Sequence, residues 1–537
     1  MKSDRRKMIE LKVSVDQSVL RHHISESLNY KDLVKKLMED GCDIRTKSIQ
    51  GEGLLHIATQ MNREDVASWL LKNGCNIDEE NRDGRTALHV AVYMNHVGLV
   101  RWLLNSGANI SKKDIYGWTP FLIAVTENHT QLIALLVQNG ADINDSLESG
   151  EKALHIAVHG NHLDLAAWLL DMGFKLEDRN EKGWTPFHIA VYENNKEMAS
   201  WLLNNGADVN AKTNDGCTAL HIAAQLNHFE MAKWLVDSGC DINAKIASGQ
   251  TAIHVTAKEN YPELLNWLIQ NGCDVNERDL EGWTGLHVAA QENHLDVCRL
   301  LAEEGADVRD RDNRDHTPLH IAAKENNRSV VAWLLENGAS VTDRNKDGWT
   351  ALHFAANHTE LVKLLVENGS DVNAKCNKGS TVLHRAVDAN NKELVSWLLD
   401  RGCNAALEDG DGWTPLFFAV TRGLTGMMSL LIERGTPVCH QDARGRTVLH
   451  YAARKNRKEL AKQLLHHGCF INETDRNGQT PLHVAAYRNH LEFVDWLMGE
   501  GCDVTVKDIL GRTAADLADE RKFETVAKLL RVGRLDV

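Results

Sequence analysis

The stretch "DGRTALHVAVYMNHVGLVRWLLNSGANI", residues 83–110, decides the fold. Its opening Asp-Gly pair predicts a turn in which glycine supplies a positive φ. Thr86 then caps a short helix, "ALHVAVYM", which Asn95 ends because asparagine tolerates the left-handed conformation that terminates helices. The following "VGLVRWLLN" has apolar residues at helical spacing and predicts a second helix, closed by Gly107. The stretch therefore predicts one turn followed by two short helices.

The same phrase returns along the whole chain at a fixed period. Its Thr, or the equivalent residue, recurs every 33 residues apart from one step of 31. The short step arises in "ALHFAANHTELVKLL", which lacks two residues between its helices, so a local distortion is expected near Asn357. The equivalent positions are Gly53, Thr86, Thr119, Lys152, Thr185, Thr218, Thr251, Thr284, Thr317, Thr350, Thr381, Thr414, Thr447, Thr480 and Thr513.

The period of 33 with "TPLHIAA" (317–323) and "TPLHVAA" (480–486) resembles the ankyrin repeat. The resemblance covers nearly the whole chain and implies an all-α repeat solenoid, with about 15 signature repeats and one degenerate N-terminal unit. The last unit replaces the motif His with Asp516 and turns polar, as a terminal repeat must. The expected organisation is a basic tail at 1–18, a degenerate capping repeat at 19–47, the array at 48–507 and a C-terminal capping repeat at 508–537.

Composition narrows the classes of partner. The net charge of −15 argues against nucleic acid, because phosphate binding needs a basic face. No apolar run approaches the 18 residues of a membrane span. Seven of the eleven cysteines occupy a "GC" slot that holds Ala141 or Ala207 elsewhere, so they are interpreted as small packing residues in a reducing, cytoplasmic protein. They are Cys42, Cys75, Cys240, Cys273, Cys403, Cys469 and Cys502.

The sequence does not indicate a catalytic or metal-binding site. Twelve of the 26 histidines are the motif His, from His56 to His483, and are expected to bond to backbone groups of the turns. Equivalent residues lie about 10 Å apart in stacked repeats, too far to share one metal ion. The chain has no P-loop, nucleophile elbow or H-E-x-x-H motif. We therefore expect no enzyme activity, no metal and no cofactor.

The fourteen tryptophans fall into two slots. Nine open the "WLL" of the second helix, where other units have Leu, and are interpreted as packing residues: Trp69, Trp102, Trp168, Trp201, Trp234, Trp267, Trp333, Trp397 and Trp496. Five stand in "GWT", a slot that elsewhere holds Arg85, Glu151 or Gln250 and is therefore expected to face water. They are Trp118, Trp184, Trp283, Trp349 and Trp413.

The ankyrin resemblance implies that the turn tips and the outward side of the first helix form a concave, partner-binding surface. Tryptophan is a frequent hot-spot residue at interfaces. The GWT tryptophans are therefore candidate partner-binding residues, together with Tyr93, Tyr192 and Tyr487 of the first helices. The alternative is that each Trp lies against its neighbouring finger and stiffens the stack. Cys217 shares this water-facing slot and is expected to react with a thiol reagent well ahead of Cys240 or Cys273.

The resulting hypothesis is a monomeric, non-enzymatic scaffold or adaptor that binds protein partners along the concave groove. One alternative is a substrate-recognition subunit of a larger complex, such as a ubiquitin ligase or phosphatase, although no F-box-like tail is seen before Val537. Another is a membrane-associated adaptor whose basic start, "RRK", makes weak contact with anionic lipid.

Overall fold

The computed structural model describes residues 47–48 and 50–532. The predicted basic tail, nearly all of the predicted N-terminal capping repeat and Cys42 lie outside the described residues. The described part forms 30 helices in pairs and no sheet, apart from two isolated β-bridges. None of its helices is long and apolar enough to cross a membrane.

The first helix of each pair follows the Thr of the repeated phrase and has seven or eight residues in all units but one. The first helices are α4 (Leu54–Gln60), α6 (Ala87–Tyr93), α8 (Pro120–Thr126), α10 (Ala153–His159), α12 (Pro186–Tyr192), α14 (Ala219–Gln225), α16 (Ala252–Glu259), α18 (Gly285–Glu292), α20 (Pro318–Lys324), α22 (Ala351–Phe354), α24 (Val382–Asp388), α26 (Pro415–Arg422), α28 (Val448–Arg454), α30 (Pro481–Tyr487) and α32 (Ala514–Glu520).

The second helix has nine residues in every pair. The second helices are α5 (Glu64–Lys72), α7 (Val97–Asn105), α9 (Thr130–Gln138), α11 (Leu163–Asp171), α13 (Lys196–Asn204), α15 (Phe229–Asp237), α17 (Pro262–Gln270), α19 (Leu295–Glu303), α21 (Arg328–Glu336), α23 (Thr359–Glu367), α25 (Lys392–Asp400), α27 (Thr425–Glu433), α29 (Lys458–His466), α31 (Leu491–Gly499) and α33 (Glu524–Val532).

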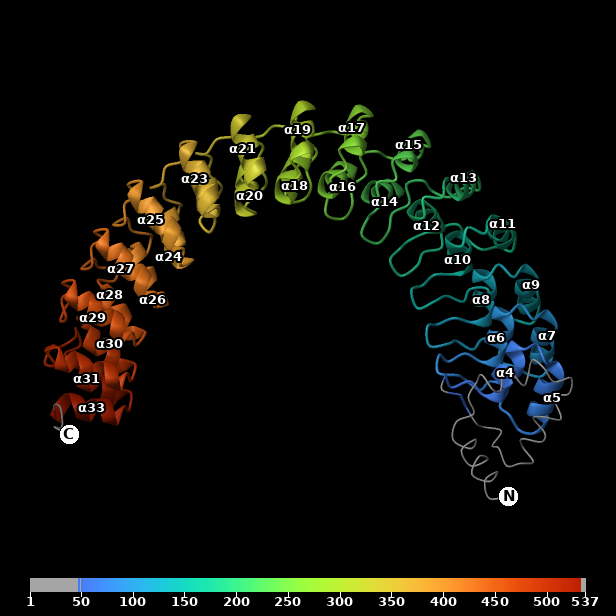
Figure 1. Ribbon diagram of the computed structural model, residues 1–537, viewed down its shortest axis with the longest axis horizontal. Coiled ribbons are helices and arrows are strands. Elements are labelled where there is room, and N and C mark those ends of the chain that lie inside the picture. Colours follow the sequence, from blue (N-terminus) through green and yellow to red (C-terminus); the bar gives the residue numbers. More distant parts are fainter. Residues whose placement is uncertain (1–46, 49, 533–537) are drawn as a thin grey trace, which may run out of the picture. The chain divides into compact units, whose positions relative to one another are not determined.

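Helices this short are marginal alone and depend on packing. Each first helix is buried along nearly its whole length, as in α6, where Ala87 to Val92 are all buried. Each second helix buries one stripe, as in α7, where Leu99, Val100 and Leu103 are inaccessible. First helices pack on their successors from α4 to α14 and from α18 to α32, so each of these units supplies the cover that its neighbour lacks (Figure 1).

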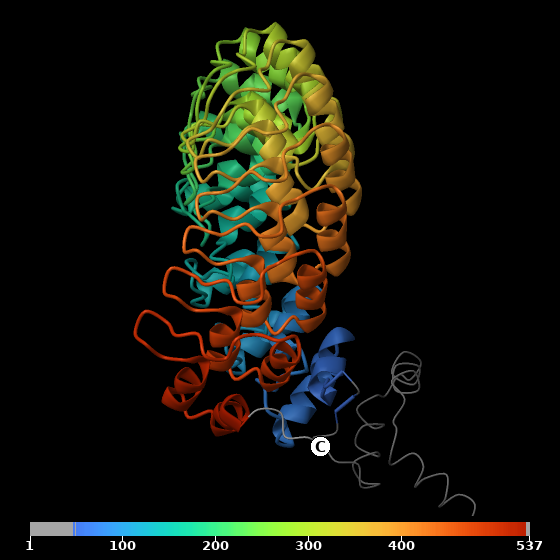
Figure 2. The same ribbon diagram turned by 90° about the vertical axis from the view of Figure 1, so that its left-hand side faces the viewer.

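Between the helix pairs the chain forms β-turn fingers, which project to one side of the helices in the orange and red repeats of Figure 2. Successive fingers are joined by one main-chain hydrogen bond, such as that from the Ile115 amide to the Asp83 carbonyl. The predicted left-handed end of the first helix is confirmed at Asn95, with φ 58°. Asp315, which replaces the turn glycine, also takes a positive φ, 60°.

The predicted distortion near Asn357 is present. The first helix of that unit, α22, has only four residues, because the deletion removes the turn that would continue it. The described chain divides into two compact units, one ending at Val255 and the other starting at Thr256. The short unit around α22 belongs to the second.

Candidate protein-interaction site

The motif histidines are structural. In all twelve, Nδ1 accepts a hydrogen bond from the amide of the residue that caps the first helix, as from Thr86 to His89 at 3.1 Å. In eleven, Nε2 donates to a backbone carbonyl of the following repeat. Burial lowers the pKa of these rings, to about 4 for His188, which keeps them neutral. Each histidine therefore ties one repeat to the next.

In the last repeat, an aspartate carboxylate accepts the hydrogen bond that Nδ1 of the motif His accepts in other repeats. Asp516 stands where the motif His would be, and its carboxylate accepts hydrogen bonds from the amide and hydroxyl of Thr513, at 2.9 and 2.8 Å. A carboxylate has no N–H to pass on to a following repeat, which suits the last position of a stack. The predicted polar ending is thus explained by local chemistry.

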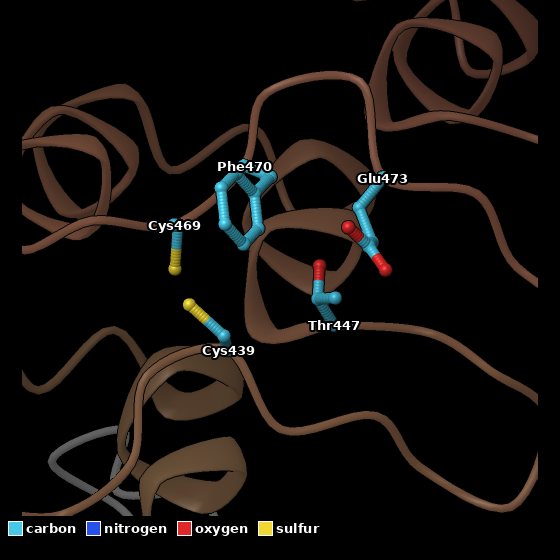
Figure 3. A pocket seen from close by; sticks show the side chains of 5 residues that line it. All are labelled: Cys439, Thr447, Cys469, Phe470 and Glu473. Atoms are coloured by element: carbon cyan, nitrogen blue, oxygen red, sulfur yellow. The ribbon is translucent and has the colours of Figure 1, made fainter.

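The residues that the structure describes form no cluster of side chains suited to metal binding. Among the described residues, no group of three or more His, Cys, Asp or Glu side chains is placed to hold a metal ion. A small hollow is lined by Cys439, Cys469, Phe470, Thr447 and Glu473, and its two sulfur atoms point toward each other (Figure 3). Each of these thiols donates to a backbone carbonyl, at 3.2 Å, so neither is prepared as a nucleophile.

The finger holds the backbone of each GWT tryptophan. The motif His of the preceding repeat also bonds to Trp118, Trp184, Trp349 and Trp413. The Trp184 amide donates to the Asn180 side chain at 2.9 Å. Its carbonyl accepts from the Asn180 amide at 3.0 Å and from His155 Nε2 at 3.1 Å. On the side of Trp184, these bonds involve main-chain atoms only. Gln479 makes the same set in its own finger. The slot therefore fixes the backbone and leaves the choice of side chain open.

All five GWT side chains are half-buried, but their contacts divide them into two groups. Three reach into the following repeat. The Trp283 indole N–H donates to Asp312 at 3.1 Å, Trp349 lies 4.6 Å from the Arg385 guanidinium, and Trp413 packs edge-on against Tyr451 at 4.9 Å. These contacts are the ones that stack stiffening requires.

Trp118 and Trp184 make no such link to the following repeat. The ring of Trp184 contacts only its own unit, at Tyr192 (5.5 Å, edge-on) and His188 (6.3 Å). The indole N–H groups of Trp118 and Trp184 donate to no acceptor within the described residues. Half-exposed rings with an unused donor are suited to contact with another molecule.

The three candidate tyrosines all lie on the surface. Tyr93, Tyr192 and Tyr487 are 49%, 47% and 39% exposed, which is high for aromatic side chains. The contact between Tyr192 and Trp184 shows that the finger slot and the end of the first helix form one continuous face. Tyr487 is covered in part by the Arg521 guanidinium, 4.4 Å from its ring centre.

The WLL tryptophans are less buried than a packing slot requires. Only Trp333 and Trp496 are buried, at 9% and 7% exposure, while the other seven are half-buried. The inaccessible position is the next residue, as at Leu169 and Leu235. The tryptophans instead cover the outer edge of this buried leucine row.

Family comparison agrees with this architecture. Family models described as ankyrin repeats match residues 22–114, 123–170, 172–246, 253–345, 340–409, 383–475, 440–508 and 467–535. The chain belongs to the ankyrin-repeat family. Comparison with curated proteins finds no match. Ankyrin repeats generally serve as protein–protein interaction modules, and ankyrin arrays are typically non-enzymatic.

Sequence reasoning missed one part of this ankyrin array's surface. The residue after the motif His, or after its replacement, is aliphatic in most repeats. Four consecutive repeats instead carry Phe354, Arg385, Phe418 and Tyr451 there. These side chains surround Trp349 and Trp413; Phe354 lies 5.0 Å from the former and Phe418 lies 5.3 Å from the latter. The change from aliphatic to aromatic or charged residues at one repeat position is the sequence feature that could have revealed this cluster.

Proposed function

We propose that this ankyrin array is a non-enzymatic scaffold or adaptor, monomeric by itself, that binds protein partners through the face carrying the GWT tryptophans and the first-helix tyrosines. The observation that carries the proposal is the Trp184–Tyr192 pair. Its main-chain atoms are already bonded within the fold, while the Trp184 ring is half-buried, the Tyr192 side chain is 47% exposed and the indole donor is unused. The fold therefore does not require these two aromatic side chains.

Tyrosine and tryptophan at such a surface favour protein partners in particular. They bury a large area at a small loss of side-chain entropy, and their polar ends still form hydrogen bonds. The hollow beside Cys439 is small and includes the polar side chains of Thr447 and Glu473, unlike the large apolar pocket that typically encloses a small molecule.

The experiment is capture of partners by the full chain followed by quantitative mass spectrometry. The intact protein is compared with a variant in which Trp118 and Trp184, the two GWT tryptophans without a link to the following repeat, are Gln, the residue that Gln250 and Gln479 already supply in this slot. A matched control replaces Trp201 and Trp397 of the second helices with Gln. Partners lost from the first variant and kept by the control support the proposal.

Equal capture by all three proteins would contradict it. The identity of the captured proteins separates the finer alternatives. Recovery of ubiquitin-ligase or phosphatase subunits would favour a substrate-recognition role. Binding to anionic vesicles that is lost on deletion of residues 1–12 would favour a membrane-associated adaptor.

A further inference from the structure

One slot of the repeat changes its charge along the chain. This exit slot is the residue five positions after the motif His or its replacement, where the first helix ends. It holds a carboxylate in five of the earlier repeats and a cation in each of the last four. The carboxylates are Glu127, Glu193, Glu259, Glu292 and Glu325, and the cations are Arg422, Lys455, Arg488 and Arg521.

The four exit-slot cations form a row on the second compact unit. Arg422 is the last residue of α26, and Lys455, Arg488 and Arg521 cap the ends of α28, α30 and α32. These helices pack in succession, and all four side chains are exposed. Figure 1 shows α26, α28 and α30 one after another in the orange to red repeats.

Helix capping alone does not explain the row. A cation at a helix C-terminus gains about 0.3–1 kcal/mol from the helix dipole. The first helices α18 and α20, however, end with Glu292 and Glu325 in or next to the same position and are as well formed. The fold accepts either charge at the exit slot, so the run of cations needs another reason.

Much of this positive charge is uncompensated. Arg422 pairs with Asp388 at 2.7 Å, and Arg521 lies over Tyr487. Lys455 and Arg488 have no acidic partner among the described residues.

The same holds for Arg454 at the end of α28 and for Arg444 and Arg476 in the adjoining fingers. Residues 441–490 contain nine Lys or Arg and four Asp or Glu, in a chain whose net charge is −15. The basic surface is therefore a local exception on an acidic protein.

We propose that the surface made by Arg444, Arg454, Lys455, Arg476, Arg488 and Tyr487 binds an acidic polypeptide segment of a partner protein. This inference rests on the proposed function and names the chemistry of one partner. Stacked repeats are about 10 Å apart, and an extended chain rises about 3.3 Å per residue. Carboxylates at every third residue of the segment would therefore meet successive cations, while an aromatic residue between them packs on Tyr487.

A short segment fits this surface better than a larger polyanion. A membrane or a long nucleic acid would also approach the acidic remainder of the chain and be repelled by it. An extended peptide can stay within the basic stretch. Its binding will weaken with salt, because the cations are exposed and screened.

The test uses the full chain and a labelled peptide with a carboxylate at every third residue, followed by fluorescence anisotropy. We expect the Lys455→Glu, Arg488→Glu variant to bind about tenfold more weakly or worse. The matched control is Lys392→Glu, Lys528→Glu, which makes the same change in net charge on the second helices α25 and α33. It should bind like the unmodified protein.

Several results would overturn the proposal. Equal weakening of peptide binding by both variants would indicate attraction by net charge alone. Equal binding of a peptide whose carboxylates are replaced by amides would show that the carboxylates are not recognised. Preferential binding of phosphatidylserine vesicles or single-stranded DNA would show that the ligand is not a polypeptide. If partner capture depends on the GWT tryptophans but is unchanged by Lys455→Glu, Arg488→Glu, the proposed function stands and this inference fails.

Discussion

At the scale of single residues, the backbone and the side chain have separate roles at the GWT position. The finger and the preceding histidine hold the main chain of Trp118, Trp184, Trp349 and Trp413. The side chain is then free to bridge to the next repeat, as Trp413 does, or to remain half-exposed, as Trp184 does. We therefore propose that binding and stiffening are divided among different members of the set.

Trp184→Gln tests the first of these roles. The free energy of unfolding should change by no more than about 1 kcal/mol, because the ring contacts exposed Tyr192 and buried His188 of its own repeat but bridges to no ring or cation of the next one. Partner affinity should fall by about 2 kcal/mol if Trp184 is a hot spot. Thermal melts and titration calorimetry measure the two effects.

Trp413→Gln is the matched comparison. It removes ring contacts with Phe418 and Tyr451, at 5.3 and 4.9 Å, and should cost about 1–3 kcal/mol of stability. A Trp184 variant that melts early and binds its partner normally would show that the division between the two groups is wrong.

The cysteines give a second prediction at this scale. Cys439 is exposed, while Cys217 is half-buried and burial raises its thiol pKa to about 11. Buried Cys240 has its pKa raised to about 12 by the same cause. A thiol reagent on the native protein at neutral pH should therefore label Cys439 first, ahead of Cys217, and Cys240 last.

This order keeps the predicted place of Cys217 ahead of Cys240 and adds Cys439 before both, because Cys439 is exposed while the finger slot of Cys217 is half-buried. Mass spectrometry of the labelled peptides over time measures the order. Labelling of Cys240 at the rate of Cys439 in folded protein would contradict it.

At the scale of elements, the pair of helices is the unit that packs, and one pair is incomplete. α22 has four residues where α20 has seven, so it supplies fewer groups to its neighbours in the stack. Local opening is easiest where packing is poorest. The missing turn, rather than any single substitution, makes this repeat different.

Amide hydrogen exchange should therefore be faster in residues 350–381 than in α20 or α14. The core amides of α20, Ile321 to Ala323, serve as the reference because they are fully buried. Restoring two residues between α22 and α23 should slow exchange in the repaired unit. Uniform protection of α20 and α22 in the unmodified protein would rule out a weak joint.

At the scale of the whole molecule, the repeated histidines link stability to pH. Burial lowers the pKa to about 4 for His188, His221, His320 and His353. In the unfolded chain these rings take up protons below about pH 6.5, while in the folded chain they stay neutral. Protons therefore favour the unfolded state, and stability is complete above pH 6.5 and lost as the pH falls toward 4.

Each such ring should remove about 1.4 kcal/mol per pH unit within that window. The urea midpoint should accordingly fall steadily from pH 7 to pH 4.5 at constant ionic strength. A stability that is constant over this range would mean that the folded protein accepts the protons, contrary to the neutral hydrogen-bond network.

The sequence by itself determined the repeat, its helices and the short tenth pair, because period, capping residues and glycine or asparagine at turns act locally. It also placed Trp184 and Tyr192 on one face. Only the tertiary structure decided which aromatic side chains bridge repeats, why Cys439 is more open than Cys217, and which cations lack partners. Those properties depend on residues of neighbouring repeats, such as Trp413 and Tyr451, whose separation in space is set by stacking and not by the local chain.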